Sequence, residues 1–423
     1  MAQYSSILPQ LQEHIGVLSS AIEAQEEILR DLRHRRTDAY QDLNFLVDPM
    51  ARLPLELQSD IFLRCFPDSS TSATEPIPSA PPMVFMAVSR MWRDIALATP
   101  RLWAALRMKY LPRSDSFVER CRNWMKRAGR YPLTLALHGD LIVDHHARDL
   151  LDEFSEQLHH LCFQVTCKNP QLLLSSNVQF PCLETLTIHR GDRASSDTLD
   201  CIQLIGAAPN LLECDLRNMF FNDSDNSDDE TDGTHYMHSM VHSSLQQLRL
   251  GCPWPWDDNS CQSESSAVPL QHLTLPALRG LYMTKFDIKM EHFISFLIRS
   301  SPPLDTVFIN FPSPDEQIVS DCFRHIPSLM SLTLDGDSSF PVISILAAHT
   351  TLLPNLGHLT IQPWRRSAYW DFDAVKRLLS ARPLRSFRIR HEDSGLSDET
   401  VIALIKELED SRGGVDICVV LVE

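Results

Sequence analysis

The stretch PCLETLTI at residues 181–188 decides the fold, because its pattern Pro-x-Leu-x-x-Leu-x-apolar recurs along the chain. Clear copies begin at Leu211, Leu278, Leu304, Leu329, Leu356 and Leu384, and weaker ones begin at Leu158 and Leu245. From Leu278 onward the copies are 26, 25, 27 and 28 residues apart. Each copy predicts a short strand, and most are followed by an amphipathic stretch that predicts a helix. One such unit cannot bury its apolar face alone, so the array predicts an α/β solenoid of parallel strands and helices over residues 107–423.

Two insertions interrupt this array. Residues 222–232 hold six acidic residues in eleven and predict a solvated loop, and residues 254–268 are rich in Pro, Ser and Asp. Near the end of the chain, residues 397–410 predict a helix and residues 415–422 a final strand.

The N-terminal segment, residues 6–47, carries a seven-residue repeat that predicts one long coiled-coil helix. One apolar row is Leu8, Ile15, Ile22, Leu29 and Leu43, and the other is Leu11, Leu18, Leu32, Ala39 and Leu46. Only Gln25 and Arg36 break the two rows. Two uses stay open. The seam can pair with a partner helix, as in a homodimer formed through residues 8–46, or it can fold back on its own domain.

Composition limits the function. The chain has 423 residues, 43% of them hydrophobic and 22% charged, as expected for two or three globular domains. Its net charge of −17 disfavours binding to nucleic acid or to an anionic membrane through the overall field. The 11 cysteines are scattered with no C-x-x-C, which favours a reducing compartment. Neither a signal peptide nor a membrane-spanning run is seen, so we expect a protein of the cytoplasm or nucleus.

Residues 48–106 predict a small all-helical domain. Leu53-Pro54 opens a helix, with Pro in the first turn where its missing N–H costs nothing. A Pro-rich loop follows over residues 67–82, and the helical pattern resumes over residues 83–96.

This segment resembles an F-box. The resemblance is carried by Leu53, Pro54, Glu56, Leu57, Ile61 and Phe62, then by Val88-Ser89-Arg90, Trp92-Arg93, Ile95-Ala96 and Leu102-Trp103. It implies contacts to a Skp-type adaptor at Leu53, Pro54, Leu57, Ile61, Phe62, Val88 and Trp92. The Pro-rich loop is longer than the usual connection in the family. The alternative is that these residues only hold three helices together.

The repeats resemble leucine-rich repeats. They lack the Asn that usually stands three residues past the last Leu, where Gly191, Asp337 and Trp364 occur instead. We therefore expect an irregular solenoid. An F-box followed by leucine-rich repeats resembles the substrate-recognition subunit of an SCF-type E3 ubiquitin ligase. The resemblance implies a non-catalytic receptor whose partners are the Skp-type adaptor, the cullin ligase core and a target protein. The second reading is a non-catalytic leucine-rich-repeat scaffold that dimerises through its N-terminal coiled coil.

Target binding is expected on the strand positions that alternate with the repeat leucines. Candidate target-binding residues there are Tyr282, Phe308, Arg388 and Arg390. Between Arg365 and Arg390 the chain has eight basic and two acidic residues, which suits an acidic or phosphorylated segment. The alternative is a solvated face with no ligand.

Motifs for catalysis were sought and not found. The sequence contains neither a phosphate-binding glycine loop nor a G-x-S-x-G nucleophile turn. The spacing of His235, His238 and His242 suits a metal, but a solvated His-rich stretch explains it better. We expect no catalytic residue, no metal and no cofactor.

Overall fold

The structure is a computed structural model and describes residues 4–65, 81–109, 115–138, 145–165, 178–190, 201–217, 240–251, 268–284, 289–311, 315–336, 339–362, 372–392 and 416–422. The chain divides into two compact units, residues 1–104 with 124–131 and residues 105–123 with 132–423. Most of the Pro-rich loop, both insertions and the helix expected at 397–410 lie outside the described residues, as do Gly191, Asp337 and Trp364.

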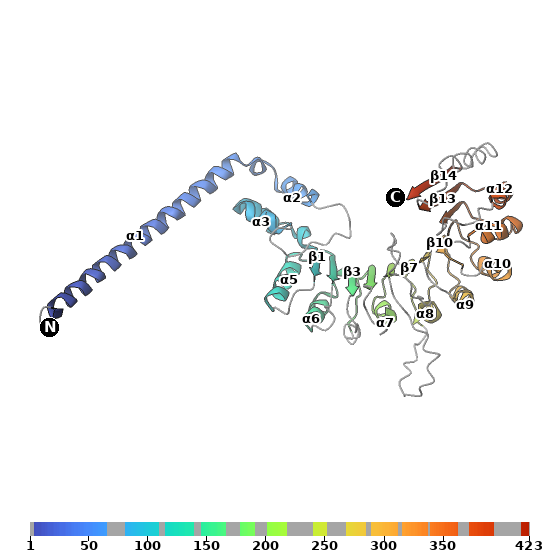
Figure 1. Cartoon of the computed structure of the whole chain (residues 1–423), viewed down its shortest axis with the longest axis horizontal. Coiled ribbons are helices and arrows are strands. Elements are labelled where there is room, and N and C mark those ends of the chain that lie inside the picture. The colour runs from blue at the N-terminus through green and yellow to red at the C-terminus, as the bar shows by residue number, and fades with distance from the viewer. Residues whose placement is uncertain are drawn as a thin grey trace, which may run out of the picture. The chain divides into compact units, whose positions relative to one another are not determined.

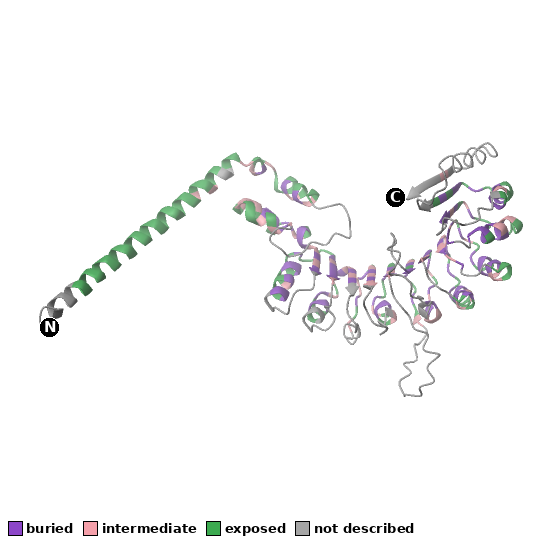
Figure 2. Ribbon diagram, viewed as in Figure 1, coloured by how far each residue is buried: buried purple, intermediate pink, exposed green. Residues whose placement is uncertain are grey.

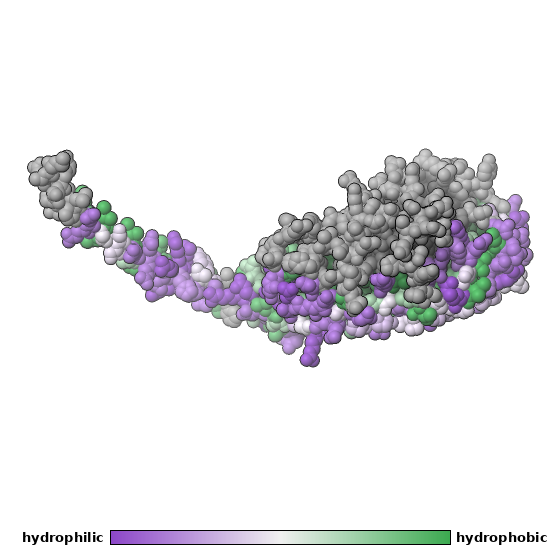
Figure 3. All heavy atoms as spheres, turned by 90° about the horizontal axis from the view of Figure 1, so that it is seen from below, coloured by the Kyte–Doolittle hydropathy of each residue, from purple (hydrophilic) through white to green (hydrophobic). Residues whose placement is uncertain are grey.

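The first unit begins with α1 (Tyr4–Val47), one helix of 44 residues that confirms the long helix expected over residues 6–47 (Figure 1). Its described side chains are almost all exposed to solvent (Figure 2). The apolar rows are no exception, with exposed fractions from 47% at Leu29 to 71% at Leu46. Figure 3 likewise shows apolar atoms on the surface of this helix. The other described helices of the first unit therefore leave the seam of α1 exposed.

Short helices follow α1 in the first unit. They are η1 (Pro49–Arg52), α2 (Leu55–Arg64), α3 (Met83–Val88), α4 (Arg90–Leu97) and η2 (Pro100–Trp103). The single helical pattern expected over residues 83–96 is thus two helices. Ser89 is extended between them, and its hydroxyl accepts a hydrogen bond from the Trp92 amide at 3.1 Å, which starts α4 with an N-cap. Phe62, Phe85 and Trp92 meet in an aromatic core, with the rings of Phe62 and Phe85 stacked at 4.3 Å.

The second unit is built on a parallel sheet of 12 strands among its described residues. In spatial order these are β1 (Ala105–Lys109), β2 (Leu133–His138), β3 (Leu158–Val165), β4 (Thr185–Arg190), β5 (Glu213–Arg217), β7 (Gln247–Gly251), β9 (Gly280–Thr284), β10 (Thr306–Ile309), β11 (Ser331–Asp335), β12 (His358–Gln362), β13 (Ser386–Glu392) and β14 (Asp416–Val422). The expected strands at the repeat leucines are confirmed. β1 begins at Ala105, so its first two residues belong to the segment 48–106 that was expected to be helical.

The described helices of the second unit all lie on one face of this sheet, and we call the other face the open face (Figure 1). They are α5 (Asp115–Arg127), α6 (His145–Phe154), α7 (Cys201–Gly206), α8 (Val268–His272), α9 (Met290–Ser300), α10 (Glu316–Arg324), α11 (Ser339–Ala348) and α12 (Phe372–Ala381). A small two-stranded sheet, β6 (Met240–Val241) with β8 (Leu273–Thr274), lies apart from the main sheet. The repeat leucines and equivalent apolar residues fill the space between sheet and helices and are almost fully buried.

One carbonyl per repeat joins successive turns of the solenoid. The Glu184 carbonyl accepts both the Leu212 and the Glu213 amide, at 2.9 and 3.0 Å. The same double acceptance recurs at the carbonyls of Leu212, Gln246, Arg279, Asp305, Met330 and Gly357. The side chains of Asn210 and Asn355, each just before a repeat Leu, also donate to the carbonyls of Pro181 and Pro327 one repeat earlier. These bonds satisfy backbone groups between successive repeats at the start of each strand.

Candidate protein-interaction surfaces

The first candidate surface lies on α2 and α3, whose buried sides meet at Phe62 and Phe85. Leu57 and Ile61 are four residues apart and so share one side of α2. They are 51% and 39% exposed, and Val88 on α3 is 53% exposed. We group these residues with the exposed Pro54 and Val84 under the name α2–α3 apolar surface. Four of the seven residues expected to contact an adaptor thus stand at the protein surface.

A buried glutamine holds the start of α2 in place. Gln58 is 7% exposed, and its side-chain amide donates to the carbonyls of Met50 and Leu53 at 2.6 and 2.8 Å. Leu53 is half-buried, and Pro54 beside it is exposed. Sequence reasoning missed Gln58. The available signal was its position four residues after Pro54, on the same side of α2 as Phe62.

Two of the expected adaptor residues belong to the interior. Phe62 is 1% exposed, so its ring packs beneath the α2–α3 apolar surface and is not accessible from solvent. Trp92 is half-buried, and its indole N–H donates to the Asp48 carboxylate at 2.7 Å. The structure therefore places Phe62 in the interior of the first unit, while the neighbouring side of α2 faces outward.

The second candidate surface is the open face of the sheet. Register places one row of side chains across it, which we call the strand-row surface: Cys162, Thr187, Asp215, Arg249, Tyr282, Phe308, Thr333, Thr360 and Arg388. Three of the four residues expected to bind a target are in this row. The fourth, Arg390, follows two residues after Arg388 on β13, and both arginines are exposed.

The middle of the strand-row surface combines aromatic rings and charges. Tyr282 and Phe308 are paired across β9 and β10. The guanidinium of Arg249 lies 5.0 Å from the centre of the Tyr282 ring, and Arg217 donates to the Asp215 carboxylate at 2.6 Å. That hydrogen bond raises the pKa of Arg217. Both arginines stand at strand positions that alternate with the repeat leucines, but neither was among the candidate target-binding residues. Arg217 and Asp215 are two residues apart on β5, whereas the register of β7 and β9 sets Arg249 beside Tyr282.

The open face also carries two half-buried histidines. Burial lowers the pKa of His160 and of His189, so their rings are neutral at pH 7. Three of the described cysteines are likewise poorly suited to nucleophilic chemistry. Burial raises the pKa of Cys121 and Cys322 to about 12, and it raises the pKa of Cys162. A nucleophilic cysteine needs the opposite shift, toward the thiolate.

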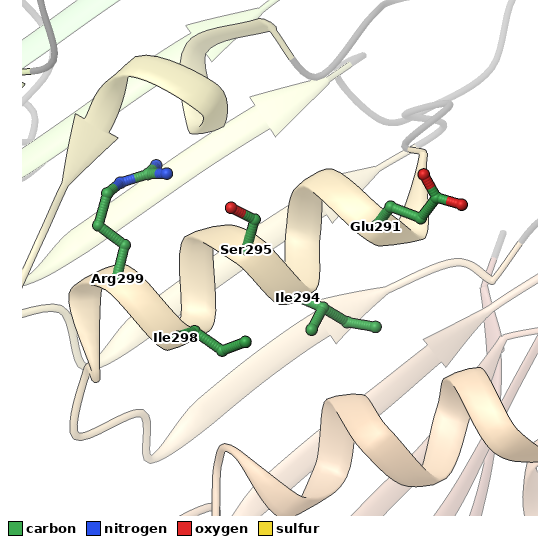
Figure 4. A pocket seen from close by; sticks show the side chains of 5 residues that line it. All are labelled: Glu291, Ile294, Ser295, Ile298 and Arg299. Carbon is green, nitrogen blue, oxygen red and sulfur yellow. The ribbon is translucent and has the colours of Figure 1, made fainter.

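A shallow hollow lies on the helical side of the second unit (Figure 4). Its five lining residues all come from α9: Glu291, Ile294, Ser295, Ile298 and Arg299. The Arg299 side chain turns away to donate to the carbonyls of Leu270 and Leu273 at 2.6 and 2.8 Å. One helix alone lines the hollow, so no second described element contributes a side chain to it.

Metal binding has no support among the described residues, which contain no group of three or more His, Cys, Asp or Glu suited to an ion. Of the three histidines weighed as ligands, His242 alone is described. It is buried, its Nε2 lies 2.9 Å from the Ala208 carbonyl, and its Nδ1 accepts from the Leu245 amide. His242 thus supports a turn between repeats.

Comparison with models of known protein families and with curated protein sequences finds no match. In the part of the chain that the structure describes, no helix combines the length and the apolar character needed to cross a bilayer. The function must therefore be argued from the two surfaces themselves.

Proposed function

We propose that the chain is the substrate-recognition subunit of an SCF-type E3 ubiquitin ligase. In this proposal the α2–α3 apolar surface binds a Skp-type adaptor linked to a cullin core, and the strand-row surface binds a target protein. The chain supplies no catalytic residue. It raises the effective concentration of the target beside a charged ubiquitin carrier, in the cytoplasm or nucleus where such ligases act.

The observation that carries the proposal is the exposure of Pro54, Leu57, Ile61 and Val88 over a packed aromatic core. Aliphatic side chains held at the surface by a rigid interior suit a partner that buries them in an apolar groove. These are positions at which the F-box resemblance places adaptor contacts. Gln58 supports the same interpretation, because its two hydrogen bonds fix the backbone just before Pro54.

The strand-row surface supports the second half of the proposal. No described helix of the second unit covers it, and its centre contains Tyr282, Phe308 and the exposed Arg249. Tyr, Phe and Arg are enriched at the centres of protein interfaces. Arg388 and Arg390 add two exposed guanidinium groups toward one end, which suits an acidic or phosphorylated part of the target.

The test is direct binding of the purified full chain to a purified Skp-type adaptor, measured by calorimetry. We expect tight binding that is lost when Leu57 and Ile61 are both changed to Glu. The matched control is Ile298→Glu, since Ile298 is 57% exposed on the outer side of α9. That variant should bind as wild type does. A folded wild-type chain that binds no adaptor refutes the proposal.

A scaffold that dimerises through α1 is the second candidate. The observation in its favour is the exposed apolar seam of α1, which the described chain leaves uncovered. The adaptor experiment separates the two, because a scaffold without ligase function has no need of the α2–α3 apolar surface.

A further inference from the structure

The seam of α1 has the length and pattern of one helix of a two-stranded coiled coil, but no other described helix of the first unit covers it. Leu18 and Ile22 near the first half of the seam are 50% and 58% exposed, and Leu32 and Leu43 in the second half are 55% and 54% exposed. Apolar rows that recur every 3.5 residues are stabilised when another helix covers them. The identity and direction of that helix follow from the two polar residues in the rows.

Gln25 and Arg36 interrupt the seam, one in each row. In a parallel, in-register pair each residue faces its own copy, so two Arg36 side chains meet between the helices. Like charges there are unfavourable. In an antiparallel pair the first row faces the second. One antiparallel register then sets Gln25 against Arg36 of the second copy, where the amide oxygen can accept from the guanidinium.

In that register all the remaining layers of the seam are apolar. The layers pair Ile15 with Leu46, Leu18 with Leu43, Ile22 with Ala39 and Leu29 with Leu32 of the second copy, and symmetry repeats each of them. Shifting the register by one heptad toward residue 8 sets both Gln25 and Arg36 against leucine. The arrangement with polar facing polar is therefore the favoured one.

Charges beside the seam agree with the same direction. Glu23, Glu26 and Glu27 precede the middle of the paired segment, and Arg33, Arg35 and Arg36 follow it. Antiparallel pairing brings the acidic group of one helix next to the basic group of the other, and it sets Glu26 against Arg33 twice by symmetry. Within the described residues neither Glu26 nor Arg33 forms an ion pair, whereas Arg35 already pairs with Asp31 at 2.9 Å.

We propose that residues 15–46 of α1 form an antiparallel two-stranded coiled coil with a second copy of this chain. The partner is a second copy because the one sequence complements itself in both its polar breaks and its charges. The paired segment is about 48 Å long at 1.5 Å per residue. The helical units that follow residue 47 in the two copies therefore begin at opposite ends of the pair, so one dimer presents two separated α2–α3 apolar surfaces. The pairing does not depend on adaptor binding.

Sedimentation velocity of the full chain over a range of concentrations tests the pairing. We expect a dimer for wild type and a monomer for Ile22→Glu. Val17→Glu is the matched control, because Val17 is 63% exposed on α1 but lies outside both rows. It should remain a dimer. A wild-type chain that stays monomeric, or a Val17→Glu chain that dissociates as readily as Ile22→Glu, overturns the proposal.

A charge exchange tests direction and register. Arg33→Glu should weaken the dimer about tenfold, because two attractive pairs become repulsive. Arg30→Glu, off the seam on the same helix, should change it little. The double variant Glu26→Arg/Arg33→Glu should restore wild-type affinity. In a parallel pair residues 26 and 33 face Ala21 and Ile28, so an absence of rescue contradicts the antiparallel register.

A disulfide gives an independent measure of direction, since residues 1–50 contain no cysteine. Leu18→Cys and Leu43→Cys chains are mixed, oxidised and digested with trypsin. We expect a disulfide joining the peptide of residues 1–30 to that of residues 37–52. A disulfide between two copies of the 1–30 peptide, formed by Leu18→Cys protein alone, would show a parallel pair and overturn the proposal.

Discussion

Arg249 and Tyr282 face each other across β7 and β9, with the guanidinium carbon 5.0 Å from the centre of the phenol ring. A cation over an aromatic face holds the ring in place and leaves its edge available. The Tyr282 ring also leans toward Gly280, where an added Cβ would lie only 3.1 Å from it. The Tyr282 ring at the centre of the strand-row surface is thus held in place by its neighbours, and such preorganisation would favour the target binding that we propose.

The first prediction concerns this centre. Tyr282→Ala with Phe308→Ala should weaken target capture by at least about 30-fold, because truncating a central aromatic anchor costs about 2 kcal/mol or more. Proteins captured from cells by tagged wild-type and variant chains are compared by quantitative mass spectrometry. Adaptor capture should be unchanged in the same samples, and Ile298→Glu on the outer side should capture targets as wild type does. Retention of every captured target by the double variant would show that the target binds elsewhere.

Gln58 offers a second prediction. Gln58→Met keeps the shape of the side chain but removes both hydrogen bonds to the carbonyls of Met50 and Leu53, at a cost of about 2 kcal/mol. Amide hydrogen exchange measured by mass spectrometry on the full chain should become faster at the start of α2, and adaptor affinity should fall. Gln317→Met is the control, since Gln317 is exposed and, among the described residues, its side-chain amide donates only to Asp321 on its own helix. Unchanged exchange near Pro54 would contradict the positioning role of Gln58.

The repeat leucines made the second unit predictable, because Leu186, Leu281 and their equivalents are buried at every strand. β1 escaped prediction since the stretch ALRMK at residues 105–109 lacks the Leu-x-x-Leu spacing and follows directly on a helical segment. The break between α3 and α4 at Ser89 was not predicted, because apolar residues continue at helical spacing on both sides of it. Its extended backbone is set by the cap that it forms on α4.

The sequence indicated which residue types belong to the candidate surfaces, but not which of them are exposed and which are buried. Ile61 and Phe62 are neighbours on one helix, and sequence periodicity alone does not decide which of them faces the core. The structure buries Phe62 because Phe85 and Trp92 come from later in the chain to cover it. The contact of Arg249 with Tyr282 likewise joins residues 33 positions apart, and only the strand register reveals it.

A buried arginine gives the third prediction. Arg382 is 4% exposed, and it donates to the carbonyls of Leu346, His349, Leu352 and Leu353 at 2.6 to 3.2 Å. Arg382→Leu leaves those buried acceptors without this donor, so we expect a loss of about 3 kcal/mol in the free energy of unfolding. The exposed Arg385 three residues later is the control, and Arg385→Leu should change the thermal midpoint little. Equal midpoints for the two variants would show that Arg382 is dispensable.

Gly251 gives the fourth prediction. Its φ is +124°, and an added Cβ would lie 1.9 Å from the Thr284 carbonyl oxygen on the neighbouring strand β9. Gly251→Ala should therefore lower the thermal midpoint clearly, with a cost of about 2 kcal/mol or more from backbone strain and the clash. Gly357→Ala is the matched control, because its Cβ would meet only the Arg385 side chain at 3.5 Å. Tolerance of alanine at residue 251 would contradict the close approach of β7 and β9.

The last prediction is a pH dependence of the second unit. Burial lowers the pKa of His160 and His189 in the folded chain below the ordinary value of 6.5. As pH falls below 6.5 the unfolded chain binds protons at these rings before the folded chain does, so stability falls in that range. The charged and titratable neighbours are Glu184, Glu213 and His159 around His160, and Asp215, Arg217 and His138 around His189.

Thermal midpoints at pH 7.5, 6.5 and 5.5 measure this effect. The drop between pH 7.5 and 5.5 should be smaller in the variant His160→Gln/His189→Gln, because glutamine cannot take up a proton in this range. His325→Gln is the control, since His325 is exposed at the end of α10, and it should keep the wild-type slope. If the double variant loses stability with falling pH as steeply as wild type does, the acid sensitivity arises from carboxylates such as Asp215 and not from these two rings.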